Sequence, residues 1–361
     1  MLAIAVHRNV PKPDVPESLR CDIEAAVQGH RPIAVIAIDG SPRLVLPPTV
    51  FPVTTNNDAA RSDDVQHAVA RLLQSVRTAA AQTDGSDVLA ALSLGGDVAR
   101  TALVTWQAPA GSAPARIAVI DSGLSDSGPL VLTRPGLETV VPQEVSTFLD
   151  RSNALPDLHG IDVLLVGFGY TAAPQEPLPQ DLRTTVVSLW TSVTERSGAS
   201  VRVLSAPRSG VGPDTRFTTR VVSFETTVAP LGRTKRSAQP IVFTDGSSVS
   251  FLPDSTTFRD ESAAGRTLTG IGTWLREDPR RRAEVVGTTS SAGTEAGRQH
   301  LSAARASAVA KLLVKIGARP DQLTIRGAGY VAEPPDRTTN GALDPLAAAA
   351  NRTVRITLTS G

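Results

Sequence analysis

The residues best suited to bind a ligand lie in one run of the C-terminal third. The hydroxyl side chains of residues 288–291 follow an apolar segment, and Arg298 and Arg305 come after them. A guanidinium binds a carboxylate through two parallel hydrogen bonds. Two arginines close to one loop therefore favour an anion as the ligand.

The positions in this run follow a fixed pattern. Without a gap, it contains Gly287, Thr288, Thr289, Ser290, Gly293, Arg298, Leu301, Ser302, Arg305 and Ala306. Upstream lies Phe251–Phe258, which contains Asp254. Downstream lie Gly327–Tyr330 and Asn351–Ile356, which contains Arg352. These four elements, in this order, resemble the OmpA-like peptidoglycan-associating domain.

The resemblance implies a ligand. In the family, an Asp and an Arg of this loop–helix unit hold the zwitterionic end of diaminopimelate, from the stem peptide of peptidoglycan. The Arg is kept as Arg305, and the first turn of the following helix favours the same carboxylate. The Asp is replaced by Ser290, the His by Thr288 and the Asn by Arg298. Loss of a charge-assisted bond costs about 1–3 kcal/mol, roughly tenfold to a hundredfold in affinity.

We therefore expect weak or altered peptidoglycan binding, with candidate ligand residues Arg305, Ser290, Thr289, Asp254, Arg298 and Arg352. Two other interpretations remain open. Arg305 would then only tie the Ser290 loop to its helix, and Arg352 would only stabilise the last strand. Neither interpretation requires a ligand.

A second candidate site lies at the end of an N-terminal strand. Asp121 and Ser125 follow the apolar segment Arg116–Ile120, and ligands of open α/β sheets bind at the carboxyl ends of strands. The turn resembles the metal-binding Asp-x-Ser-x-Ser turn of von Willebrand A domains, whose oxygens hold a divalent cation. Gly123 stands at the third position, so these two residues are weak metal candidates, and a loop-capping role for Asp121 is the alternative.

The remaining residues provide little for other chemistry. The five histidines are scattered and Cys21 is the only cysteine, which predicts neither a metal centre nor a disulfide. Gly167–Gly169 lacks the third glycine of a dinucleotide loop. A Gly-x-Ser-x-Gly nucleophile motif is absent from the sequence. We expect a non-enzymatic protein without a cofactor.

Hydrophobic patterns divide the chain into two domains and a linker. In residues 1–228, short apolar strands alternate with amphipathic helices, which predicts a mostly parallel α/β sandwich of von Willebrand A or Rossmann-like layering. Residues 229–239 form a polar linker. Residues 240–361 have the order β-α-β-α-β-β, an α+β domain of the OmpA-like type. Two of the strands are predicted at Ser247–Phe251 and Arg216–Phe224.

Composition limits the partners and the compartment. The 361 residues have a formal net charge of +1, which predicts neither nucleic acid nor a membrane surface as partner. No run of about 18 apolar residues predicts a transmembrane segment. The two-domain arrangement resembles exported actinobacterial OmpA-family proteins. We therefore expect an extracytoplasmic envelope location, such as the outer membrane, with an export signal or anchor outside this sequence; a cytoplasmic location is the alternative.

Three functions fit these observations. The first is an envelope protein that docks on peptidoglycan while its N-terminal domain binds an unknown protein partner. The second is an OmpA-like scaffold that no longer binds the wall. The third is a metal-dependent adhesion module that uses Asp121.

Overall fold

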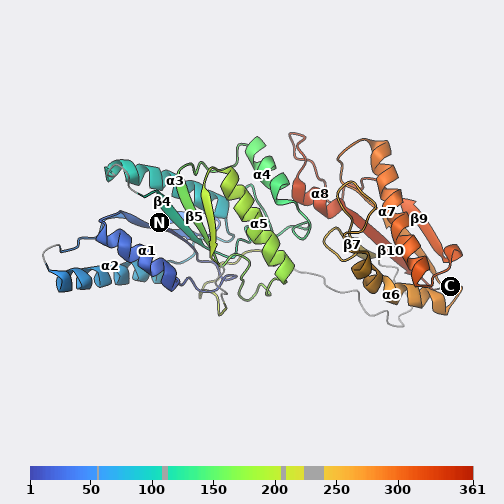
Figure 1. Cartoon of the computed structure of the whole chain (residues 1–361), viewed down its shortest axis with the longest axis horizontal. Coiled ribbons are helices and arrows are strands. Elements are labelled where there is room, and N and C mark those ends of the chain that lie inside the picture. The colour runs from blue at the N-terminus through green and yellow to red at the C-terminus, as the bar shows by residue number, and fades with distance from the viewer. Residues whose placement is uncertain (55–56, 108–112, 205–208, 223–239, 361) are drawn as a thin grey trace. The chain divides into compact units, whose positions relative to one another are not determined.

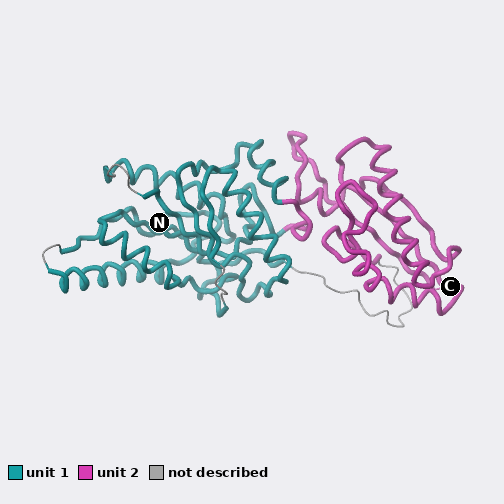
Figure 2. The backbone as a smooth tube through the Cα atoms, in the orientation of Figure 1, with its two compact units in different colours: residues 1–133, 142–223 teal, residues 134–141, 224–361 magenta. Residues whose placement is uncertain are grey.

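The computed structural model describes residues 1–54, 57–107, 113–204, 209–222 and 240–360, which form two compact units. The first unit comprises residues 1–133 and 142–223, and the second comprises residues 134–141 and 224–361 (Figure 2). The predicted linker, residues 229–239, lies outside the described residues.

The first unit is built on a six-stranded sheet with the order β3-β2-β1-β4-β5-β6. Two of its neighbouring strands, β4 and β5, are labelled in Figure 1. All neighbouring strands are parallel except β3, which is antiparallel to β2. The elements are β1 Leu2–Ala5, α1 Glu17–Gln28, β2 Ile33–Ile38, β3 Arg43–Thr49, α2 Asp58–Thr78, α3 Val88–Thr105, β4 Ala115–Ile120, α4 Pro142–Arg151, β5 Ile161–Val166, α5 Gln180–Arg196 and β6 Ser200–Leu204.

Helices cover both faces of this sheet. The apolar stripes of α1 and α2 pack on one face, where Ala118 and Ile120 of β4 join their core cluster. Ile117 points to the other face, because a Cβ built on Gly95 of α3 would lie 3.0 Å from its Cδ1. Alternate residues of β4 therefore contact different helices, and this explains why residues 117–120 are apolar on both faces of the sheet.

Helix α3 is the one helix in the described ranges that is long and apolar enough to cross a membrane, with a mean hydropathy of 1.3. The sequence analysis predicted no such segment. Leu89, Leu92 and Gly95 are among the buried residues of α3, and Gly95 faces the sheet. Its apolar character is thus accounted for, in part, by packing in the core of the unit.

A strand was predicted over Arg216–Phe224. The described part of this segment, residues 216–222, has an irregular backbone and forms no strand. Two buried side-chain amides hydrogen-bond the backbone of this segment, in the way that a neighbouring strand would. Asn9 accepts from the N–H of Thr219 (3.1 Å) and donates to its carbonyl (3.2 Å). Gln175 does the same for Val222 (2.7 and 3.0 Å). The alternating sequence therefore reflects a partly buried strap rather than an edge strand.

The second unit has a four-stranded sheet with the order β7-β10-β8-β9. Strand β10 is antiparallel to β7 and β8, while β8 and β9 are parallel. Its elements are β7 Ile241–Thr244, α6 Glu261–Glu277, β8 Arg282–Gly287, α7 Glu295–Ile316, a 3-10 turn Pro320–Gln322, β9 Leu323–Gly327, α8 Pro345–Asn351 and β10 Thr353–Thr359. Helices α6 and α7 form the core with the sheet.

Two features of this unit differ from the predicted order. The first strand is Ile241–Thr244 and not Ser247–Phe251, because Phe251 forms only an isolated bridge to Phe258, with which its ring stacks. Helix α8 also precedes the last strand. The sequence of α8, in which four Ala follow Pro and Leu, shows no helical period of apolar residues. Its N-cap is Asp344, whose side chain accepts hydrogen bonds from the N–H groups of Leu346 and Ala347.

Residues Arg134–Val141 belong to the second unit although they precede α4 in the chain. Arg134 forms an ion pair with Asp344 (2.9 Å). Gly136 has a φ of +104° and lies so close to α8 that an added Cβ would be 2.0 Å from the carbonyl oxygen of Leu346. The chain therefore contributes an early segment to its C-terminal unit, which the predicted domain bounds did not include.

Candidate functional site

Two glycines bring helix α7 close to the sheet at the candidate site. Gly287 ends β8 and Gly327 ends β9, and the two residues are partners in the parallel register. A Cβ on Gly287 would lie 2.1 Å from the carbonyl oxygen of Ser302, and one on Gly327 would lie 2.5 Å from the N of Ala303. Both glycines of the motif therefore serve the packing of the loop–helix unit.

The loop after β8 is buried. Thr288 accepts and donates hydrogen bonds at the start of β10, with its Oγ1 2.6 Å from the carbonyl oxygen of Asn351 and 2.7 Å from Oγ1 of Thr353. Thr289 and Ser290, two predicted ligand residues, are 5% and 7% exposed. Oγ1 of Thr289 has no hydrogen-bond partner within the described chain. In this conformation the loop presents little surface to a ligand.

A carboxylate that the sequence analysis did not single out lies beside the altered position. The fully buried Asp336 accepts a hydrogen bond from the N–H of Ser291 through Oδ2 (2.8 Å), while its Oδ1 has no partner in the described residues. The neighbouring Arg337 donates to Oγ of Ser291 (3.0 Å). The segment before α8 is thus fastened to the loop that contains Ser290.

Arg298 is engaged with the same loop. Its Nη1 donates to the carbonyl oxygens of Ser291 (3.1 Å) and Gly293 (2.6 Å). In the family this position is an Asn, and here the longer guanidinium ties the loop to the first turns of α7. The charge of Arg298 therefore lies among carbonyl oxygens of the loop.

Arg305 lies on the buried side of α7, with 4% of its surface exposed. Its Nε donates to the carbonyl oxygen of Ser255 (3.0 Å) and its Nη2 to that of Leu252 (3.4 Å), and the guanidinium lies 5.3 Å from the ring centroid of Phe251. Burial lowers the pKa of Arg305, and the negative charge of Asp245 opposes this shift. In the described chain no carboxylate lies within 4.0 Å of this guanidinium.

Charged neighbours of Arg305 come from three other segments of the unit. Arg352, just before β10, forms an ion pair with Asp245, just after β7 (Nε–Oδ2 3.0 Å). Asp254 lies in the loop that Arg305 caps and has a φ of +47°. Arg305, Arg352 and Asp245 line a small cavity of about 10 Å³, roughly the volume that holds one water molecule.

The structure thus separates the predicted ligand residues into two groups. Arg305, Arg352 and Asp254 share one electrostatic environment, with Asp245 added to it. Thr289 and Ser290 lie in the loop held by Asp336, and Arg298 of α7 binds that loop. In the described chain Arg305 makes no hydrogen bond to that loop. Neither Asp245 nor Asp336 was predicted from the sequence, since both lie outside the four motif elements.

The N-terminal candidates are fully buried. Oδ1 of Asp121 accepts from the N–H of Gly123 (2.7 Å), which has a φ of +75°. Oγ of Ser125 donates to the carbonyl oxygen of Ser86 (2.7 Å). Within the described residues no group of three His, Cys, Asp or Glu side chains is placed to hold a metal. The geometry of Asp121 is that of a turn-capping carboxylate.

Asp121 nevertheless has an unusual neighbour. His7 follows β1 and Asp121 follows β4, so the two flank the point where the strand order reverses, the usual ligand position in such sheets. Nε2 of His7 lies 4.0 Å from Oδ2 of Asp121, and both side chains are fully buried. Burial lowers the pKa of His7 and raises that of Asp121. Both ring nitrogens and this oxygen lack a hydrogen-bond partner in the described chain.

Comparison with known proteins identifies the C-terminal domain. The model of the OmpA family matches residues 250–344, so this domain is OmpA-like. No curated protein matches the chain.

Similar solved structures include the peptidoglycan-associated lipoprotein from Burkholderia pseudomallei, with 22% identity over 30% of this chain and 86% of that chain (TM-score 0.24). The periplasmic domain of Helicobacter pylori MotB has 18% identity over 35% and 80% of the two chains (TM-score 0.27). An outer membrane protein from Borrelia burgdorferi has 21% identity over 34% and 100% (TM-score 0.24).

Proposed function

We propose that this chain is a non-enzymatic cell-envelope protein that associates with peptidoglycan through its OmpA-like domain. The family match over residues 250–344 supports the class of protein. The name of one similar protein, a peptidoglycan-associated lipoprotein, points to the same ligand. The envelope location, outside the cytoplasm, follows from this proposal because peptidoglycan is found there.

Arg305 is the observation that carries the proposal. Its guanidinium is held in place by two carbonyl oxygens, which orient the group but leave its positive charge without an adjacent carboxylate. A ligand carboxylate would supply the missing charge, and a buried charge-assisted bond is stronger than a neutral one. The terminal carboxylate of diaminopimelate is such a group.

The same geometry supports weak binding or altered specificity. Ser290 cannot neutralise the ammonium of diaminopimelate, and its loop is fastened by Asp336 and Arg337. Binding of a ligand beside this loop requires the segment before α8 to move first. The free energy needed for that opening makes the binding free energy less favourable and so weakens the affinity.

The test is sedimentation of the full chain with insoluble, diaminopimelate-type peptidoglycan. The proposal predicts that wild type sediments in part and that Arg305→Ala remains in the supernatant. Arg266→Ala is the matched control, because Arg266 is exposed on α6 of the same unit. Equal sedimentation of wild type and Arg305→Ala would contradict the proposed role of Arg305.

A second pair of variants tests the altered position. Ser290→Asp alone would place a second carboxylate next to Asp336, and two adjacent buried carboxylates repel each other. Ser290→Asp combined with Asp336→Asn restores the family's charge without this repulsion. We expect the double variant to sediment more completely than wild type, and more completely than Ser290→Asp alone.

A scaffold without wall binding is the second candidate function, and the burial of residues 288–291 favours it. In that case Arg305 serves only to hold the 252–257 loop against α7. If wild type does not sediment but the double variant does, the fold has kept the geometry and this chain has lost the ligand. That outcome would support the scaffold function.

For the N-terminal unit we propose a von Willebrand A-like layering and a role in binding a protein partner. The sheet order and the antiparallel edge strand β3 support this layering. Metal-dependent adhesion through Asp121 is disfavoured by the burial of Asp121 and Ser125. Titration with Mg²⁺ or Ca²⁺ tests it, because a bound cation raises the melting temperature.

A further inference from the structure

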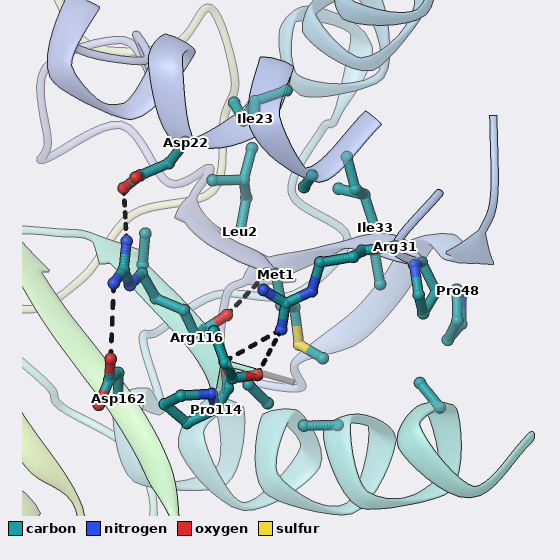
Figure 3. A pocket seen from close by; sticks show the side chains of 18 of the residues that line it. Met1, Leu2, Asp22, Ile23, Arg31, Ile33, Pro48, Pro114, Arg116 and Asp162 are labelled. Atoms are coloured by element: carbon teal, nitrogen blue, oxygen red, sulfur yellow. Dashed lines mark hydrogen bonds and ion pairs between the residues drawn. The ribbon is translucent and has the colours of Figure 1, made fainter. Parts of the chain in front are cut away.

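The first unit contains a cavity at the opposite end of the sheet from Asp121. It has a volume of about 340 Å³ and lies between α1 and α3, below the amino ends of β1, β2 and β4 (Figure 3). Ligand sites of small molecules have volumes of about 300–1,000 Å³, and they combine apolar walls with a few polar groups. This cavity is therefore large enough for a small ligand.

Much of the lining is apolar. Leu2 comes from β1, Ile33 from β2, Ile23 from α1, and Ala102 and Trp106 from the end of α3. These side chains carry no group that could hydrogen-bond a polar ligand body, apart from the indole of Trp106. The chemistry of the walls fits a hydrocarbon chain.

The polar side chains of the lining include two arginines and two carboxylates. Arg116 forms ion pairs with Asp22 (2.7 Å) and Asp162 (3.5 Å), so these carboxylates share one cation. Arg31 lies apart from them, as Figure 3 shows. Its Nη2 donates to the carbonyl oxygens of Ala113 (2.7 Å) and Pro114 (3.2 Å).

In the described residues no carboxylate lies within 4.0 Å of Arg31. Its guanidinium packs near the ring of Trp106, 5.9 Å from the centroid. Burial, and then the positive charges of Arg31 and Arg116, lower the pKa of the Met1 α-amine to about 5. An anion at this position meets Arg31 without displacing an existing ion pair.

We propose that this cavity binds a small anionic amphiphile, with a hydrocarbon chain between α1 and α3 and a carboxylate on Arg31. This site is separate from the peptidoglycan function proposed above, since it uses other residues in the other unit. Saturated carboxylic acids of medium length are the simplest ligands of this class.

Calorimetric titration of the full chain with octanoate tests the site. We expect saturable binding, with the affinity rising about fourfold for each methylene from hexanoate to decanoate, as burial of the chain requires. Octanamide, the neutral analogue, should bind at least tenfold more weakly than octanoate. Octylammonium should not bind, because it would face Arg31.

Two variants separate charge from volume. Arg31→Gln should lower octanoate affinity at least tenfold and leave octanamide unchanged. Ala102→Phe, which fills the cavity from α3, should abolish binding of both compounds. Arg77→Gln, an exposed arginine on α2, is the control and should bind octanoate as wild type does.

Three results would overturn the proposal. The first is no binding of octanoate by wild type at millimolar concentration. The second is stronger binding of octylammonium than of octanoate, which would assign the site to Asp22 and Asp162. The third is octanoate binding that survives Ala102→Phe, which would place the ligand elsewhere on the protein.

Discussion

Substitution of Gly287 by Ala tests the packing that forms the loop–helix site. The added Cβ would lie 2.1 Å from the carbonyl oxygen of Ser302 and 2.9 Å from its carbonyl carbon. Both are backbone atoms of α7, so a rotamer change cannot relieve the overlap, and the helix must move by about 1 Å. Overpacking of this kind costs about 2–3 kcal/mol. With an m value of about 2 kcal/mol/M in urea, the unfolding midpoint of the OmpA-like unit falls by roughly 1 M.

The assay must report on one unit, because a chain of two units does not unfold in a single two-state step. The chain has three tryptophans, and Trp274 on α6 is the one in the second unit. After 5-fluorotryptophan labelling, the fluorine resonance of Trp274 follows this unit through a urea titration, while Trp106 and Trp190 follow the first.

Gly265→Ala is the matched control. Gly265 lies on α6 with no atom within 4 Å of an added Cβ, so alanine should stabilise the unit by about 0.5–1 kcal/mol. We expect the two variants to move the Trp274 midpoint in opposite directions. An unchanged or raised midpoint for Gly287→Ala would refute the packing argument.

Three further predictions concern buried polar groups. Gln175→Ala leaves the N–H and C=O of Val222 buried without a partner and should cost about 2–3 kcal/mol, with faster amide hydrogen exchange at Val222; exchange as slow as in wild type would contradict the strap interpretation. Because burial raises the pKa of Asp121 above 3.8, the unfolded chain loses this proton first as pH rises, and stability falls through that interval. Asp121→Asn removes the fall, so its unfolding free energy relative to wild type should increase as pH rises above about 4 in urea titrations; a constant difference would argue against the raised pKa. Asp344→Ala removes the N-cap of α8 and the ion pair with Arg134, which should lower stability by about 1–2 kcal/mol, measured by the Trp274 resonance; Glu295→Ala on α7, an exposed acid, is the control.

The sequence predicted the features that depend on local pattern. The apolar segment Arg116–Ile120 predicted strand β4, because burial on both sheet faces leaves a clear signal. The spacing from Gly287 to Arg305 placed the loop–helix unit correctly. Helix α7 begins at Glu295, earlier than its apolar stripe suggested, since its first two turns are polar.

The features that depend on distant contacts were not predictable. Asn9 and Gln175 hold the strap at Thr219 and Val222, and side-chain amides give no periodic signal for such a role. Asp336 lies close to Ser290 only because the segment before α8 folds back over the loop. The contribution of residues 134–141 to the second unit likewise depends on packing against α8, which the sequence pattern does not encode.

The most direct test of the central claim compares two types of peptidoglycan. Arg305 is proposed to take the terminal carboxylate of diaminopimelate, and a stem peptide with lysine at the same position lacks this group. The full chain should therefore sediment with diaminopimelate-type peptidoglycan and remain in the supernatant with lysine-type peptidoglycan. Equal sedimentation with both types would contradict the role assigned to Arg305.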